Sequence, residues 1–285
     1  MVGSSKLKKT TIVIVGLGLI GGSLAAALKK FGRKQFHVVG LTRSMTKVRQ
    51  AKRKKWIDEG YTQPKPALRH ADLVVLCGPL HLIAKTAKKI DAFIPQGCVV
   101  TDVGSVKGEI CAAVKKAKLK KGLFVGAHPM AGSHLTGMAH GSADLYKGAT
   151  VYITPTQNTK RLAVKKVKRL WQKVGAKIKI ASPKEHDNQV AATSHLPHVI
   201  AFSLASLMPA QLMQVSGSGF RDMTRMAQSD PELWQYILRT NRSAVLKWIK
   251  TYERHFKQWH QLVTRSSSQS LVRALKKTRQ KRVQL

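Results

Sequence analysis

The feature that most constrains this chain is an apolar run over residues 11–28 that glycines divide into two unlike halves. The first half, residues 11–15, is rich in β-branched side chains and predicts a strand, whereas residues 19–28 have the composition of a helix. Between them stands Gly16-Leu-Gly18-Leu-Ile-Gly21. The first glycine of such a spacing permits a tight turn, the second lets backbone approach a pyrophosphate, and the third lets helix pack on strand. The run therefore predicts a dinucleotide-binding unit.

The same run also resembles a targeting signal. Lysines precede it, it ends near an Ala-Ala-Ala triplet, and about 18 apolar residues are enough for a minimal membrane span. Neither a signal peptide nor a membrane span needs a change from strand-forming to helix-forming residues, so the glycines argue against both. The three cysteines (Cys77, Cys98 and Cys111) form no CxxC motif and no disulfide framework, which fits a reducing compartment. We expect a cytoplasmic protein without a membrane segment.

Downstream, short apolar runs alternate with helical patterns. Strands are predicted over residues 35–41, 72–76, 98–101, 123–126, 151–154 and 177–180, with helices over 44–55, 80–92, 105–117 and 160–174. This alternation predicts βαβ units and a parallel sheet. After residue 182 the strand signals stop, and long helices are predicted over 185–213 and 230–262. We expect an α/β, Rossmann-like domain over residues 1–182 and an all-helical domain over 183–285, which ends in a basic helix or frayed tail.

The charge balance is unusual, because Lys and Arg number 51 and Asp and Glu only 13, a net charge of +38. Such a field attracts phosphates, carboxylates and nucleic acids. A nucleic-acid-binding protein is therefore one alternative. However, the lysines are spread along the whole chain, and no interleaving of aromatic and basic residues or recognition motif is present. We expect small anionic molecules as partners, and no specific nucleic acid or membrane.

The end of the second predicted strand indicates the cofactor. NAD sites usually place an Asp or Glu there to bind the ribose 2′-hydroxyl, yet residues 1–57 contain no acid. The sequence at that point is Thr42-Arg43-Ser44, which suits a 2′-phosphate, although Arg43 is also simply one of many basic residues. We predict NADP in preference to NAD. The predicted cofactor-binding residues are Gly16, Gly18, Leu19, Ile20, Gly21, Thr42, Arg43, Ser44 and Asp102.

Two further motifs follow predicted strands, where ligands of parallel sheets bind. Ser105 lies in Thr101-Asp-Val-Gly-Ser-Val-Lys107, and its hydroxyl either contacts a substrate or caps the next helix. His128 lies in Gly126-Ala-His-Pro-Met-Ala-Gly132 and is either catalytic or structural. Both positions are candidates for the chemistry.

The helical part carries its own polar motifs. His195 and His198 are three residues apart and share a helix face if Pro197 is absorbed as a kink. With Asp187 they could form a metal site, but no HExxH motif occurs and a cation would add to the positive charge, so we expect no metal. Arg221 and Arg225 are candidate carboxylate clamps.

These motifs in this order resemble the prephenate/arogenate dehydrogenase family of tyrosine biosynthesis. The resemblance covers about residues 11–241 and rests on VGLGLIGGS, TDVGSVK, GAHPMAGS, HDNQVAATSHLPH and GFRDMTRMAQSDPELW. It implies an N-terminal dinucleotide-binding domain, a helical domain that forms a homodimer, and an active site between them. The implied reaction moves a hydride from C4 of prephenate to NAD(P) as the 4-hydroxyl loses its proton, after which loss of CO₂ gives 4-hydroxyphenylpyruvate. An arogenate-specific NADP enzyme, which gives tyrosine directly, is the alternative.

The resemblance also implies residue roles. The family's catalytic histidine matches His128, and the serine that orients the same substrate hydroxyl matches Ser105. The family's substrate-binding residues match Arg225, His198, His195 and Asp187, the last of which would hold an ionic network. Many members carry Glu where this chain has His134, so substrate preference and inhibition by tyrosine stay open. A hydroxyacid-type or pyrroline-carboxylate-type dehydrogenase would share the glycine loop but would not need the later motifs.

Overall fold

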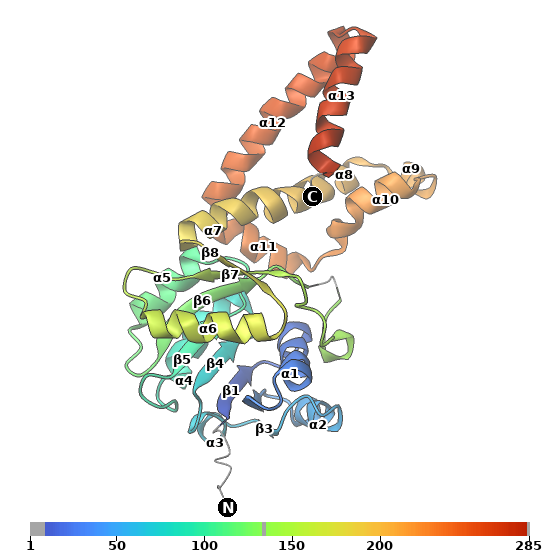
Figure 1. The fold of residues 1–285 in the computed structure, drawn as a ribbon. Coiled ribbons are helices and arrows are strands. Elements are labelled where there is room, and N and C mark those ends of the chain that lie inside the picture. Colours follow the sequence, from blue (N-terminus) through green and yellow to red (C-terminus); the bar gives the residue numbers. More distant parts are fainter. Residues whose placement is uncertain (1–8, 133–134, 284–285) are drawn as a thin grey trace, which may run out of the picture.

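A mostly parallel sheet organises the first part of the molecule (Figure 1), as seen in a computed structural model that describes residues 9–132 and 135–283. Across these residues the strands lie in the order β3-β2-β1-β4-β5-β6-β7-β8. Their bounds are β1 (Thr10–Val15), β2 (Phe36–Leu41), β3 (Glu59–Tyr61), β4 (Leu73–Leu76), β5 (Val99–Asp102), β6 (Leu123–Pro129), β7 (Thr150–Thr154) and β8 (Lys177–Ile180). The predicted Rossmann-like α/β class is confirmed.

Two features of the sheet differ from the prediction. Strand β7 runs antiparallel to β6, and the described part of their connection contains the short turn η2 (Met138–His140) but no helix of the kind that usually crosses between parallel strands. Strand β3 was missed, since it has only three residues and carries an exposed glutamate at the sheet edge.

Helices cover both faces of the sheet. One face packs against α1 (Leu19–Phe31), α2 (Met45–Arg53) and α6 (Arg161–Lys173), and the other against α3 (Pro64–Leu68), η1 (Leu80–Leu82), α4 (Ile83–Ile90) and α5 (Gly108–Ala117). Successive strand residues point to opposite faces, so Ile12 and Ile14 join the first core and Val13 the second. Trp234 and Ile237 of the helical part are buried in that second core, which fixes the helical part to the sheet.

The helical part lies over the edge formed by the carboxyl ends of the parallel strands (Figure 1). Its elements are α7 (Pro183–Val190), the π-helical turn η3 (Ala191–His195), α8 (Leu196–Leu207), α9 (Ala210–Gln214), α10 (Ser218–Thr224), η4 (Arg225–Gln228), α11 (Pro231–Thr240), α12 (Arg242–Arg265) and α13 (Ser268–Val283).

The predicted long helices are shorter in the structure. The first ends at Leu207, because Met208 precedes a proline and takes an extended conformation. The second is divided at Asn241, which ends α11 and caps α12. The basic C-terminal segment forms helix α13, which folds back beside α12 (Figure 1).

Candidate active site

The glycine loop between β1 and α1 has the geometry that a dinucleotide needs. Gly16 has φ +100°, a left-handed conformation that favours glycine. A Cβ atom on Gly21 would lie 1.9 Å from the carbonyl oxygen of Gly16, whereas a Cβ on Gly18 would meet no atom within 4 Å. Gly18 is also the N-cap of α1 and offers no side-chain cap, so the first N–H groups of this helix are left for an anion. The loop therefore fits a diphosphate.

The end of β2 presents hydroxyl groups and a cation. Arg43 is exposed between Thr42 and Ser44, and the Ser44 hydroxyl oxygen accepts a hydrogen bond from the N–H of Lys47 at 3.4 Å, which caps α2. The first acids of the chain lie away from this point. Glu59 begins β3 and pairs in register with Val39, at a distance from the carboxyl end of β2, and Asp58 precedes it.

Asp102 ends β5 but does not face outward. Its carboxylate is fully buried and accepts hydrogen bonds from the Lys107 ammonium, from the N–H of Gly104 at 2.8 Å and from the N–H of Ala127 at 3.1 Å. The ammonium of Lys107 also donates to the carbonyl of Ala127 at 2.8 Å. Asp102 therefore ties the loop after β5 to β6, in contrast to the expected direct contact with the cofactor.

Ser105 lies half-buried in the same loop. Helix α5 begins at Gly108, three residues beyond Ser105, so the predicted capping role is wrong. The cap comes instead from Asp187 of α7, whose carboxylate accepts the N–H groups of Lys107 and Gly108, each at 2.8 Å. A carboxylate at this position is also favoured by the helix dipole. The Ser105 hydroxyl is thus not needed for the helix.

His128 stands on β6 opposite Tyr152 of β7 and is 8% exposed. Its Nδ1 atom lies 2.9 Å from Nε2 of His186, and Nδ1 of His186 lies 2.8 Å from Oδ1 of Asp187. Burial lowers the pKa of His128 well below its ordinary value, and the nearby His186 and Lys107 lower it further. Burial also lowers the pKa of His186, although Asp187 opposes that shift. Both imidazoles are therefore neutral near physiological pH.

His195 and His198 meet at one indole ring. The turn η3 precedes Pro197, which has no N–H to donate to the preceding turn, so the expected kink takes the form of a π-helical turn. His198 stacks on Trp234 with ring centroids 3.6 Å apart, and His195 meets the same ring edge-on at 5.8 Å. Burial lowers the pKa of His195 to about 4. Both rings are thus held in place by packing.

The two candidate arginines differ in their surroundings. Arg221 donates from Nε and Nη2 to the carbonyl of Ser216, at 3.2 and 2.8 Å. Arg225 is exposed at the start of η4, which packs against α8, the helix that carries His198. Within the described part of the chain no hydrogen bond or ion pair engages the Arg225 guanidinium. Arg225 is therefore the better placed of the two for a carboxylate ligand.

Sequence reasoning missed two residues of this network. His186 contacts His128 directly, and Asn241 donates from Nδ2 to the carbonyl of Asp187 at 2.8 Å and to Nδ1 of His195 at 3.2 Å. Sequence reasoning could give Asn241 no role because its partners lie 46 and 54 positions earlier in the chain. His134, which departs from the family pattern, lies outside the described residues.

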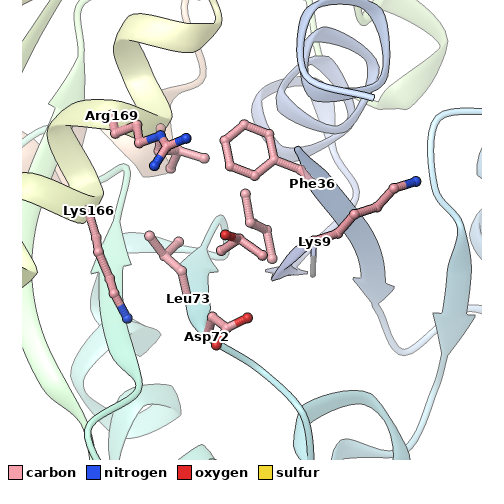
Figure 2. A pocket seen from close by; sticks show the side chains of 9 residues that line it. Lys9, Phe36, Asp72, Leu73, Lys166 and Arg169 are labelled. Atoms are coloured by element: carbon pink, nitrogen blue, oxygen red, sulfur yellow. The ribbon is translucent and has the colours of Figure 1, made fainter. Parts of the chain in front are cut away.

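A separate cavity of about 260 Å³ lies at the opposite edge of the sheet (Figure 2). It is lined by apolar residues of β1, β2 and β4, by Asp72, and by Lys166 and Arg169 of α6. The strand residues that line it stand at the amino ends of their strands, whereas ligands of open parallel sheets bind at the carboxyl ends. We therefore do not assign this cavity to the cofactor or the substrate.

Comparison with known families covers almost all of the chain. Residues 24–180 match the family described as prephenate dehydrogenase, nucleotide-binding domain, and residues 182–277 match prephenate dehydrogenase, dimerization domain. Among relatives, a cyclohexadienyl dehydrogenase of Zymomonas mobilis is 31% identical over 96% of this chain and 95% of its own length. A prephenate dehydrogenase of Bacillus subtilis is also 31% identical, over 94% of this chain and 74% of its own length.

Solved structures give the same result. A prephenate dehydrogenase from A. aeolicus, in complex with hydroxyphenyl propionate and NAD⁺, is 33% identical and has a TM-score of 0.88, over 98% of this chain and 99% of that chain. The arogenate dehydrogenase of Synechocystis is 29% identical with a TM-score of 0.83, over 96% of this chain and 99% of that chain.

Proposed function

The chain belongs to the prephenate dehydrogenase family, and on that premise we propose that His128 is the base of its reaction and that the site lies between the glycine loop, the end of β6 and helix α8. The protein is an NAD(P)-dependent prephenate or arogenate dehydrogenase. The observation that carries the assignment of His128 is a neutral imidazole at a carboxyl strand end, 8% exposed and held from behind by His186 at 2.9 Å.

Each part of the site has a separate role in the proposed reaction. The N–H groups at the start of α1 bind the diphosphate of the cofactor, whose nicotinamide supplies the hydride acceptor. Ser105 orients the 4-hydroxyl of the substrate, and His128 takes the proton of that hydroxyl as hydride leaves C4. Loss of CO₂ from C1 then makes the ring aromatic, and this gain drives the reaction. The protein therefore has mainly to align C4 with the nicotinamide and to place one base.

The test is a four-way assay of the purified protein, with prephenate or arogenate and with NADP or NAD. We propose NADP as the preferred cofactor, with NAD possible, because Arg43 and two hydroxyl groups stand at the end of β2 and Asp58 and Glu59 lie elsewhere. We propose prephenate as substrate, with arogenate as the alternative. The expected result is a higher kcat/KM with NADP. A chain that turns over none of the four combinations would contradict the proposed reaction.

We expect Arg225→Ala mainly to raise KM for the substrate, by about 10–100-fold, with a small change in kcat. A hydrogen-bonded charge pair contributes about 1.5–3 kcal/mol, and an interaction made equally in ground and transition states appears in KM. Steady-state kinetics of Arg221→Ala provide the comparison, because its guanidinium is engaged by Ser216. A larger rise in KM for Arg221→Ala than for Arg225→Ala would exchange the two assignments.

We propose that the functional domains divide between residues 182 and 183. This division is supported by helix α7, which begins at Pro183, and by the two family matches, which end at residue 180 and begin at residue 182. On this division Asp187 of the second domain caps helix α5 of the first. The network behind His128 would therefore join the two domains.

We propose that the helical domain forms a homodimer. Helices α8, α9, α12 and α13 expose large apolar side chains, among them Leu207, Leu212, Phe256, Val263 and Leu275. An 18-residue window within Pro183–Leu207 is apolar enough to pass for a membrane span, with mean hydropathy 1.3 and 22% of the window buried. A second copy would cover such a surface, and patches of this kind mark interfaces. Sedimentation should give twice the chain mass of 31.5 kDa; a monomer at micromolar concentration would contradict the dimer.

We propose a cytoplasmic location without a specific nucleic-acid or membrane partner. The candidate membrane helix carries His186 and Asp187, whose side chains are bonded to groups of the sheet domain, so a single helix of this kind is weak evidence for a membrane protein.

A further inference from the structure

We propose that His186 is a positioning residue that fixes the tautomer of His128, so that Nε2 of His128 carries a lone pair and can accept a proton. The inference rests on the proposed function of His128 as the base. It follows from one chain of hydrogen bonds that begins at the N-terminus of α5 and ends at the imidazole of His128.

The chain starts at the carboxylate of Asp187. Oδ1 accepts the N–H of Lys107 and Oδ2 accepts the N–H of Gly108, both at 2.8 Å, and backbone N–H groups can only donate. A Cβ on Gly108 would lie 2.7 Å from Oδ2, so a glycine is what allows this close approach. An ionised carboxylate has only acceptors to offer. The third contact, 2.8 Å from Oδ1 to Nδ1 of His186, therefore requires the proton on that nitrogen.

The next two contacts then have only one assignment. A neutral imidazole has one N–H and one lone pair, so His186 with its proton on Nδ1 presents a lone pair at Nε2. Nδ1 of His128 lies 2.9 Å from that lone pair and must donate to it. The single proton of neutral His128 is thus on Nδ1, which leaves Nε2 as the acceptor. The opposite tautomer would offer an N–H to the substrate hydroxyl and could not take its proton.

Contacts on two sides hold the His186 ring and the backbone of its neighbour Asp187 in place. Tyr152 meets the ring of His186 edge-on, with centroids 4.9 Å apart, and its hydroxyl donates to Oε1 of Gln189 at 2.9 Å. Asn241 donates to the carbonyl of Asp187 at 2.8 Å. When the hydroxyl proton moves to Nε2, the bond from Nδ1 to His186 stays in place, and the oxygen lone pair forms the C4 carbonyl as hydride departs.

The experiment combines a spectroscopic and a kinetic measurement. Protein labelled with ¹⁵N at histidine is examined by long-range ¹H–¹⁵N correlation, with the signals of His128 assigned by their loss in His128→Asn. We expect the proton on Nδ1 in the wild type. His186→Phe retains a ring without an acceptor, and we expect it to lower kcat about 10²-fold with KM within about threefold. His186→Gln restores an acceptor oxygen and should recover part of that loss.

The pH profile of kcat separates positioning from a general loss of structure. The titratable groups around His128 are His186, Lys107 with its partner Asp102, and His195. We expect the acidic limb of the profile to move in His186→Phe and to stay in His70→Gln, which alters an exposed histidine at the opposite edge of the sheet.

The outcomes distinguish the inference from the proposed function. Wild-type activity in His128→Asn would refute the role of His128 itself. An inactive His128→Asn together with wild-type kcat and an unchanged pH profile in His186→Phe would overturn only the positioning role. If His186→Phe does not fold, the wild-type spectrum and His186→Gln decide: a proton on Nε2 of His128 in the wild type overturns the inference.

Discussion

Replacing His128 with Asn should lower kcat by about 10²–10⁴-fold at saturating substrate and cofactor, the range expected when a general base is removed. The Asn side chain is smaller than the imidazole and carries an amide at its tip. That amide can still donate a hydrogen bond to Nε2 of His186, so this buried nitrogen keeps a partner. The loss therefore reports the missing base and not a collapsed site. Steady-state kinetics at several pH values measure it.

The pH dependence of the wild type gives a second check on the same residue. His128 acts in its neutral form, and burial lowers its pKa well below the ordinary value. Because the folded pKa is depressed, the neutral base persists below pH 6.5, and activity falls only as the pH passes through the lowered pKa. In His128→Asn this acidic limb should disappear. In His128→Asn, the affinity for the cofactor, measured by fluorescence, and the urea midpoint of unfolding should stay unchanged. If either fell together with kcat, the loss of activity would have to be assigned to folding.

Alanine substitutions at two glycines of the same loop should affect different properties: Gly21→Ala should lower stability, and Gly18→Ala should weaken cofactor binding. In Gly21→Ala the new Cβ would lie 1.9 Å from the carbonyl oxygen of Gly16, a backbone atom that cannot turn aside. We expect a loss of about 3 kcal/mol in the free energy of unfolding, at the upper end of the usual cost of overpacking. In Gly18→Ala the Cβ would meet no protein atom within 4 Å, so stability should change by less than about 1 kcal/mol.

Gly18→Ala should affect cofactor binding much more than it affects stability. The space above Gly18 is where backbone approaches the diphosphate, so a methyl group there should raise the Kd for NADP about 10-fold or more, which is about 1.4 kcal/mol. Urea unfolding measures the first effect and titration of protein fluorescence the second. If Gly18→Ala bound cofactor as tightly as the wild type, the diphosphate would have to lie elsewhere.

The N-terminal architecture was predictable because its signals are local. The change from β-branched to helix-forming residues at Gly16–Gly21 placed β1 and α1, and the alternation of short apolar runs with helical patterns placed β2 and β4 to β8. The relation of β7 to β6 was wrong because the direction of a strand depends on the path of its connection, which apolar periodicity does not report. Strand β3 was missed because three residues at an edge give almost no periodicity.

The sequence by itself determined the fold class, the glycine loop and the identity of the candidate base, because each is written in neighbouring residues or in one motif. Only the tertiary structure decided what surrounds that base. Asp102, expected at the cofactor, is buried against Lys107, while His186, for which no catalytic role was expected, contacts His128 across 58 positions. Hydrogen bonds act over about 3 Å in space and do not depend on separation along the chain, so only the packing of α7 against β6, β7 and α5 could reveal which imidazole nitrogen holds the proton.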